Sequence, residues 1–151
     1  MQKITTFLTY NGTAEEAVNL YTSVFKNSKI VNISRYNGAV MSATFELEGQ
    51  TFMALNGGPT FSFAQGTSLF VSCETQAEVD DLWEKLTAGG GEPGRCGWLK
   101  DRFGVSWQII PTALGRLLGD KDPARSGRAM KAMLGMNKLD IAALESAADG
   151  R

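Results

Sequence analysis

The sequence predicts an α+β fold in which two βαβββ units share one domain and a helical extension follows. Three observations predict it: period-two strands that end at turn residues, two amphipathic helices that each begin with a capping box, and a match of the chain to itself. The domain is expected over residues 1–111, with the first unit at 3–58, the second at 66–111 and the helical extension at 112–151.

The first unit opens with an expected strand at residues 4–10, which the turn pair Asn11-Gly12 ends. A helix then begins at the capping box Thr13-Ala14-Glu15-Glu16, in which the side chains at both ends of the box satisfy free backbone amides. The helix is expected to end near Lys26-Asn27. Its apolar residues recur at the i, i+3, i+4, i+7 spacing of one helix face, and they are Ala17, Leu20, Tyr21 and Val24.

Three strands complete the first unit, and we expect them at residues 30–36, 40–47 and 51–56. Each one ends at residues that favour a tight turn because they tolerate positive φ or restrict the backbone. These turns are Asn37-Gly38, Glu48-Gly49 and Gly57-Gly58-Pro59.

The second unit is predicted by a repeat. A shift of 62 positions places residues 6–25 on the second unit without a gap, so that Thr13 falls on Thr75 and Glu16 on Glu78. A shift of 55 places the last strand of the first unit on the last strand of the second, with Met53 on Gln108. The second helix has its own capping box at residues 75–78 and ends at a glycine run, and its apolar face is Val79, Leu82, Trp83 and Leu86.

A hairpin at residues 96–111 closes the second unit, with its turn at residues 102–104. Period-two alternation places Val105, Trp107 and Ile109 on one face of its second strand, and Ser106, Gln108 and Ile110 on the other. Gln108 is therefore expected to point away from the apolar face. Lys100 and Asp101, which precede the turn, are expected to form a surface ion pair.

The extension shows three short apolar stripes at helical spacing. Asp122-Pro123 is typical of an N-cap followed by proline in the first helical position. The stripes are Leu114, Leu117 and Leu118, then Met130, Met133 and Leu134, and finally Ile141 and Leu144. The methionines could form an adaptable groove for a partner, but packing on the sheet or on a second subunit is the favoured interpretation.

Two curled sheets, each with its helix on the convex side, would leave their concave faces to line a shared cup, which is where a small molecule would bind. Alternation predicts the lining. It comprises Thr6, Leu8, Tyr10, Met53, Leu55, Ser68, Phe70, Ser72, Ser106, Gln108 and Ile110.

Several of these side chains have two interpretations. Trp98, Phe61, Phe63 and Tyr10 could clamp a planar ligand, or they could each pack in a core. Asn56 could direct its amide into the mouth of the cup, or it could only form a turn. Gln108 could orient a ligand, or it could be a buried amide bonded to Ser106 or Thr51.

Two residues are candidates for catalysis. Glu46 shares a strand face with Ser42 and Thr44, so it could act as a base or bind a cationic ligand, or it could simply face solvent. Cys96 could act as a nucleophile, although an inert thiol is favoured because no histidine or helix N-terminus lies near it in the sequence.

Composition excludes several classes of function. The chain of 151 residues contains no histidine, the commonest general base and metal ligand, and its formal net charge of −1 gives no basic surface for nucleic acid. Cys73 and Cys96 lie in different predicted strands, so a disulfide or zinc site is not expected. No signal peptide and no apolar run of membrane-spanning length is found, which favours a cytoplasmic protein.

The duplicated unit, the segment Ala54-Leu55-Asn56-Gly57-Gly58-Pro59 and the hairpin from Cys96 to Gln108 resemble the glyoxalase/bleomycin-resistance (vicinal oxygen chelate) superfamily. The resemblance spans nearly the whole chain, and its two segments are typical of the PhnB-like branch, which often has the label 3-demethylubiquinone-9 3-methyltransferase. That label has no support in the sequence, because no glycine-rich loop joins a strand to a helix with an acidic residue beyond it.

The resemblance implies a homodimer. It also implies that metal-dependent members hold their metal with His or Glu at the positions of Thr6, Met53, Ser68 and Gln108, none of which is a strong ligand here. We therefore expect a protein without metal or cofactor that binds a small molecule of unknown identity. The alternatives are an enzyme that uses Glu46 or Cys96 on a small polar substrate, with Gln108 and Asn56 orienting it, or a resistance protein that sequesters a drug.

Overall fold

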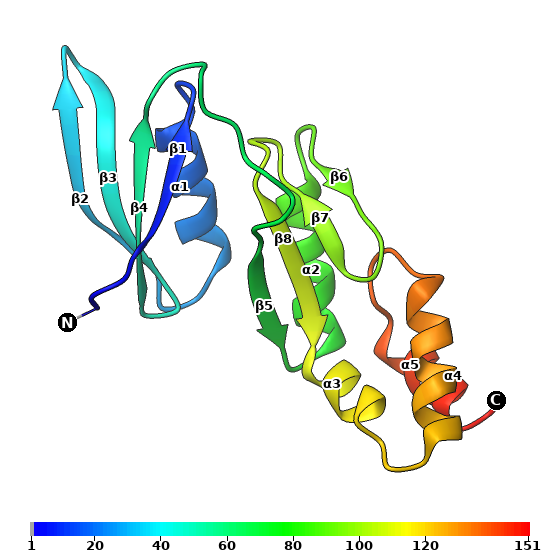
Figure 1. Ribbon diagram of the computed structural model, residues 1–151. Helices are drawn as coiled ribbons and strands as arrows, with labels where there is room; N and C mark the ends of the chain where they lie inside the picture. Colours follow the sequence, from blue (N-terminus) through cyan, green and yellow to red (C-terminus); the bar gives the residue numbers. More distant parts are fainter. Residues whose placement is uncertain (1) are drawn as a thin grey trace. The chain divides into compact units, whose positions relative to one another are not determined.

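The computed structural model describes residues 2–151, which form two compact units (Figure 1). The first unit ends at Ser62, and the second runs from Phe63 to Arg151. Each unit contains one four-stranded sheet with a helix packed on one face. The predicted α+β class and the repeated βαβββ order are confirmed.

The first sheet has the strand order β1-β4-β3-β2, in which β1 and β4 are parallel and the other pairs are antiparallel. Both of its hairpins turn through two residues of positive φ, Asn37-Gly38 and Glu48-Gly49, as the type I′ turn requires. The elements are β1 (Thr6–Tyr10), α1 (Ala14–Val24), β2 (Lys29–Tyr36), β3 (Ala39–Leu47) and β4 (Gln50–Asn56).

The core of the first unit lies between α1 and the sheet. The Tyr10 hydroxyl donates a hydrogen bond of 3.1 Å to the Tyr21 hydroxyl on α1, and the rings of Phe45 and Phe52 stack with their centroids 5.5 Å apart. Because each fully buried large side chain contributes about 1.5–3 kcal/mol, this layer stabilises the unit.

The N-terminus of α1 differs from the prediction. Thr13 makes no capping hydrogen bond, because its backbone (φ −110°, ψ 11°) is not in the extended conformation typical of an N-cap. Asn56 replaces it: its Oδ1 accepts a hydrogen bond of 2.9 Å from the amide of Ala14, and its Nδ2 donates to the carbonyl of Val40 at 3.0 Å. The last residue of β4 therefore caps the helix.

The second sheet repeats the arrangement in the order β5-β8-β7-β6, with β5 parallel to β8. The predicted Thr75 cap is confirmed, because its hydroxyl accepts from the Glu78 amide at 3.2 Å, whereas the Glu78 carboxylate accepts from the amide of Glu74, one residue before the cap, at 2.8 Å. The elements are β5 (Leu69–Cys73), α2 (Gln76–Thr87), β6 (Glu92–Pro93), β7 (Trp98–Lys100) and β8 (Ser106–Pro111).

The first strands of the two units are related by a different sequence shift from the one that relates their helices. Phe7 pairs with Met53 in the first sheet, and Phe70 pairs with Gln108 in the second, so Phe7 corresponds to Phe70, a shift of 63 rather than 62. The reason is the connection before each helix, which has three residues (11–13) in the first unit and two (74–75) in the second. A shift of one residue exchanges the two faces of a strand.

The extension forms three helices, α3 (Thr112–Leu118), α4 (Pro123–Leu134) and α5 (Ile141–Ala148), within the second unit (Figure 1). As predicted, Asp122 caps α4 by accepting from the Ala124 amide at 3.0 Å. The three helices share a small core of Leu114, Leu117, Ala129, Leu139, Leu144 and Ala148, against which Met133 packs. Among residues 2–151 no helix combines the length and the apolar character needed to cross a bilayer.

Candidate functional site

The open face of the second sheet carries two rows of side chains. The register places Phe70 of β5, Gln108 of β8 and Trp98 of β7 side by side in one row. Ser106 of β8, Lys100 of β7 and Glu92 of β6 form the second row. The alternate residues Leu99 and Trp107 are buried on the other face, so this face is the one that α2 does not cover.

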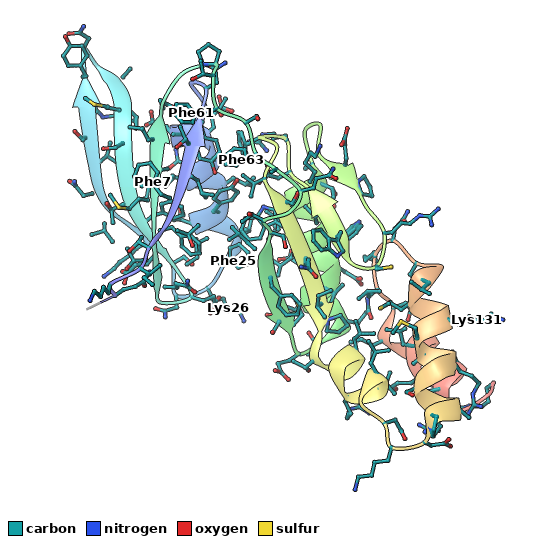
Figure 2. All side chains as sticks on the ribbon, in the orientation of Figure 1. Phe7, Phe25, Lys26, Phe61, Phe63 and Lys131 are labelled. Atoms are coloured by element: carbon teal, nitrogen blue, oxygen red, sulfur yellow. The ribbon has the colours of Figure 1, made fainter. Side chains whose placement is uncertain are left out.

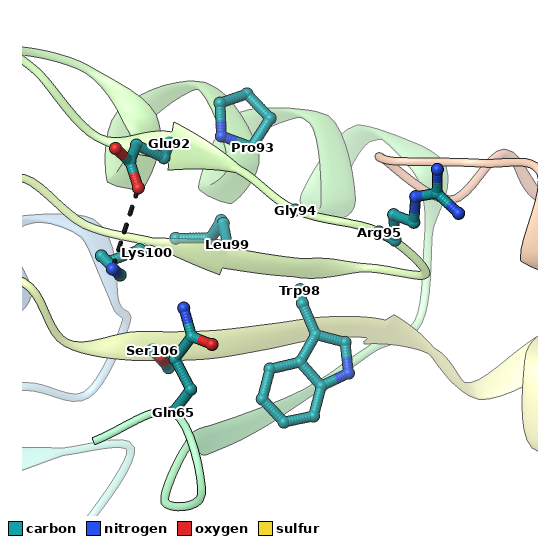
Figure 3. A pocket seen from close by; sticks show the side chains of 9 residues that line it. All are labelled: Gln65, Glu92, Pro93, Gly94, Arg95, Trp98, Leu99, Lys100 and Ser106. Carbon is teal, nitrogen blue, oxygen red and sulfur yellow. Dashed lines mark ion pairs between the residues drawn. The ribbon is translucent and has the colours of Figure 1, made fainter.

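A pocket of about 460 Å³ lies over these rows, within the range of about 300–1,000 Å³ typical of ligand sites. All of its lining residues belong to the second unit. Trp98 provides the largest aromatic surface, and Ser106 and Gln65 provide neutral polar groups (Figure 3). The lining consists of Gln65, Glu92, Pro93, Gly94, Arg95, Trp98, Leu99, Lys100 and Ser106.

The charged groups of this pocket are two cations and one anion. The Lys100 ammonium lies 3.8 Å from the Glu92 carboxylate (Figure 3), and these side chains are 38% and 72% exposed. An ion pair this exposed contributes little to stability, so an anionic ligand could replace Glu92 beside Lys100 at small cost. Arg95 adds a second, exposed cation.

Asp101 does not pair with Lys100, and that prediction is wrong. Adjacent strand residues point to opposite faces, and Asp101 is only 2% exposed. Its Oδ1 accepts hydrogen bonds from the amides of Phe103 (2.9 Å) and Val105 (3.0 Å), and its Oδ2 accepts from the Trp107 indole at 2.9 Å. Asp101 thereby fixes the turn that sets Lys100 opposite Ser106. An aspartate directly before a turn is the sequence signal that could have revealed this role.

The predicted cup residues of the second unit share the open face. Gln108 is half-buried, and its Nε2 donates a hydrogen bond of 2.9 Å to the Ser68 hydroxyl, so its partner is neither Ser106 nor Thr51. Phe70 is 59% exposed on the same face. Of the predicted residues, Trp98 and Ser106 line the pocket.

In the first unit, the strand offset corrects the predicted lining. Thr6 and Tyr10 pair with Phe52 and Asn56 on the face that α1 covers, and Tyr10 is buried there, so neither lies on the open face. The same correction applies to Leu8, which is also buried.

The open face of the first sheet carries other residues. Met53 lies on it as predicted, between Phe7 and Thr44. Phe7, which was not predicted, is half-exposed there (Figure 2). Asn56 is engaged in capping α1, so the prediction that its amide points into a cup mouth is wrong.

The four predicted clamp aromatics are divided between the units. Tyr10 packs in the α1 core and Phe61 is 54% exposed, both in the first unit, whereas Phe63 and Trp98 belong to the second unit. Figure 2 labels Phe61 and Phe63. Phe63 lies beside Gly104, where a Cβ would be 3.7 Å from its ring. Neither unit by itself assembles the four rings, and their role as a clamp stays a prediction.

The two candidate catalytic residues lie in different units. Glu46 is on the open face of the first sheet with its carboxylate 3.4 Å from the Lys29 ammonium. Cys96 is a half-buried residue in the turn before β7, with a positive φ of 58°. Burial, aided by the charges of Glu78 and Glu74, raises the pKa of Cys73 to about 12, which keeps that thiol neutral. Catalysis by Glu46 or Cys96 stays a prediction.

The positions that the resemblance assigns to metal ligands do not fit a divalent cation. Their donors are two hydroxyls, a thioether and an amide, and Thr6 faces the α1 side whereas Met53 faces the open side. Within residues 2–151, no three acidic or cysteine side chains gather closely enough to hold a metal ion.

Two βαβββ units, each with one helix-covered and one open sheet face, are the architecture that the resemblance to the glyoxalase/bleomycin-resistance superfamily implies. A family model described as 3-demethylubiquinone-9 3-methyltransferase matches residues 2–110. The chain belongs to this family, and the predicted PhnB-like branch is confirmed.

Three solved structures are similar to the chain. A putative 3-demethylubiquinone-9 3-methyltransferase, PhnB protein, from Bacillus cereus is 43% identical with a TM-score of 0.70, over 74% of this chain and 100% of that one. A Staphylococcus aureus protein is 36% identical over 72% of this chain and 94% of its own, with a TM-score of 0.36. Protein PA1353 from Pseudomonas aeruginosa shares the fold at 21% identity (TM-score 0.59; 74% of this chain, 98% of that one). No protein with a curated description matches the chain.

Proposed function

We propose that the second unit binds a small planar molecule with an acidic group in the pocket beside β7, without a metal or cofactor. One observation carries this proposal: Trp98 and Lys100 lie two residues apart on the same face of β7, and both line the pocket. An indole ring offers a flat surface for stacking, and a neighbouring ammonium pairs with a carboxylate. Ser106 and Gln65 supply further hydrogen-bonding groups.

Binding is favoured over catalysis by where the candidate catalytic groups lie, because neither Glu46 nor Cys96 is among the residues that line the pocket. Drug sequestration would use the same pocket and also requires binding without turnover. We further propose a homodimer, which the family resemblance implies and which analytical ultracentrifugation would measure.

Methyl transfer, the activity in the family's name, has less support. Nucleotide cofactors are typically held at a glycine-rich loop between a strand and a helix in a parallel, doubly wound sheet. Here the two strand-to-helix connections have three and two residues, and each sheet contains one parallel strand pair among antiparallel ones. The geometry of these sheets therefore favours a small acidic ligand over a nucleotide-like donor.

The binding test uses 2-naphthoate as the probe and the indole N–H signals of the three tryptophans as the readout in NMR titrations. We expect the Trp98 signal to shift on addition of 2-naphthoate and to shift less with the neutral 2-naphthamide or the non-aromatic cyclohexanecarboxylate. Lys100→Gln should raise the Kd for 2-naphthoate, read from the Trp98 signal, by at least about fivefold, and Trp98→Ala should do the same when the Kd is measured by isothermal titration calorimetry. Trp83→Phe on α2 is the matched control and should leave the Kd unchanged.

The outcome that contradicts the proposal is a Trp98 signal that does not move with millimolar 2-naphthoate, or an equal loss of affinity in the Trp83 control. The proposal that the pocket binds its ligand without a metal has its own test. Zn, Ni, Mn and Fe(II) ions are expected to leave the Tm unchanged, because a metal that binds the folded state must stabilise it. Stoichiometric metal in the purified protein, together with a raised Tm, would overturn that part.

A further inference from the structure

The turn between β6 and β7 forms one wall of the pocket. Gly94 and Arg95 line the pocket on one side of this turn and Trp98 on the other. The turn is closed by hydrogen bonds from the Gly94 amide to the Trp98 carbonyl (2.8 Å) and from the Trp98 amide to the Arg95 carbonyl (3.0 Å). Its two central residues, Cys96 and Gly97, both have positive φ, 58° and 86°.

A left-handed conformation costs a residue other than glycine roughly 1–2 kcal/mol, and contacts from outside the turn help to hold Cys96 in it. The extension supplies them. The Cys96 amide donates to the Met136 carbonyl and the Gly97 amide donates to the Asn137 carbonyl, both at 2.8 Å. A Cβ on Gly97 would lie 3.0 Å from Leu139 Cδ1, which shows how closely the linker between α4 and α5 packs on the turn.

The same linker is anchored on its other side to α2. Gln76 donates from Nε2 to the Leu139 carbonyl at 3.0 Å and accepts at Oε1 from the Ile141 amide at 2.8 Å. Lys138 forms an ion pair of 2.8 Å with Asp80. The linker is therefore held between a helix of the second unit and the pocket turn, and it lies beyond residue 110, where the family match ends.

We propose that the extension is a brace that holds the β6–β7 turn in its pocket-forming conformation and so sets the affinity of the pocket. The effect on affinity rests on the proposed function; the bracing of the turn does not. When the two backbone hydrogen bonds open, the turn can leave the left-handed conformation and carry Arg95 and Trp98 out of place. The apparent Kd then rises in proportion to the loss of the competent conformation.

The first test measures hydrogen exchange at the Cys96 and Gly97 amides in the full chain. Gln76→Ala removes the hydrogen bonds to Leu139 and Ile141, and we expect it to speed exchange at both amides by tenfold or more. Arg128→Ala is the matched control, because it removes hydrogen bonds to the Ala147 and Ala148 carbonyls at the far end of the extension. It should leave exchange at Cys96 and Gly97 unchanged.

Leu139→Ala is a second variant, which removes a side chain that packs on the turn. It should speed hydrogen exchange at the Cys96 and Gly97 amides. Unchanged exchange in both Gln76→Ala and Leu139→Ala, or an equal rise in the Arg128→Ala control, would overturn the brace.

The second test measures the Kd for 2-naphthoate. Gln76→Ala should raise it at least threefold, and Arg128→Ala should not. Faster exchange with an unchanged Kd would overturn the claim that the brace sets affinity while leaving the pocket proposal intact. If the unaltered chain does not bind 2-naphthoate, the pocket proposal fails, and the exchange rates still decide whether the extension braces the turn.

Discussion

The indole nitrogen of Trp107 donates a hydrogen bond of 2.9 Å to Oδ2 of Asp101, and both residues are buried. With the amides of Phe103 and Val105 on Oδ1, this bond ties the turn of the β7–β8 hairpin to the strand that follows it. The carboxylate stands at the end of the strand that carries Trp98 and Lys100, so the shape of the pocket depends on it.

Asp101→Asn is expected to destabilise the protein. An asparagine of the same shape replaces one acceptor oxygen with an NH₂ donor that would face an N–H group, and a lost hydrogen bond to a charged group costs about 1.5–3 kcal/mol. Urea unfolding should show a loss of this size. Asp81→Asn, on an exposed i,i+4 pair with Lys85, is the matched control and should change stability by less than about 0.5 kcal/mol. Equal effects in the two variants would contradict this role for Asp101.

Asn56→Ala should destabilise the first unit by about 1–2 kcal/mol, because it removes the cap of α1 and the hydrogen bond to Val40. Thr13→Ala should have little effect, since the Thr13 side chain makes no capping hydrogen bond. Urea unfolding of both variants checks this pair. The opposite ranking would restore the capping box that the sequence suggested.

The two thiols should differ in reactivity. With its pKa raised to about 12, Cys73 is ionised to only about one part in ten thousand at pH 8, and it is buried. We expect an Ellman titration to detect one thiol in the folded protein and two in urea, and Cys96→Ser to remove the first. Because the folded-state pKa is raised above 9.0, the neutral Cys73 thiol favours folding at neutral pH, and this contribution is lost as the pH rises above about 9.

The extension should open in acid before the sheets do. Hydrogen bonds from the Asp122 amide and Arg125 lower the pKa of Asp120, and hydrogen bonds from Arg125 and Arg151 lower the pKa of Asp149. A carboxylate whose pKa is lower in the folded than in the unfolded state stabilises the fold at pH values above its unfolded pKa of about 3.9. That contribution is lost as the pH falls through the folded-state pKa. Amide protection factors in α4 and α5, which correct for the slower intrinsic exchange in acid, should therefore fall below about pH 4.

Arg125→Gln provides the control for this acid sensitivity, because Arg125 pairs with both Asp120 and Asp149. The variant should be less stable near neutral pH and lose less stability on acidification. An extension that keeps its protection to pH 2.5, or an unchanged pH profile in Arg125→Gln, would contradict the assignment.

Most of the fold was predictable because local chemistry determines it. The hairpins follow from pairs such as Asn37-Gly38, and α4 begins where Asp122-Pro123 predicts. In the second unit, alternation along β8 placed Gln108 and Ser106 on the open face correctly, because Trp107 and Ile109 identify the buried face.

The errors came from contacts between residues far apart in the sequence. The cap of α1 comes from Asn56, more than forty residues after the helix begins, and no local pattern reveals it. The face of β1 was misassigned because the match between the units was anchored on the helices, whereas Phe7 follows the register of Met53. The pocket wall at Arg95 depends on Met136 and Asn137 in the extension, which the repeat does not contain.

The unequal connections before α1 and α2 also bear on how the two halves of the chain diverged. One residue gained or lost between a strand and a helix is absorbed by a surface loop at little cost, whereas the same change within β1 or β5 would turn every following side chain over. Divergence by length is thus tolerated at residues 11–13 and 74–75, one of the places where the duplicated halves differ in length. A first strand moved from one half into the other would keep each side chain on its correct face only if the connection between that strand and its helix moved with it.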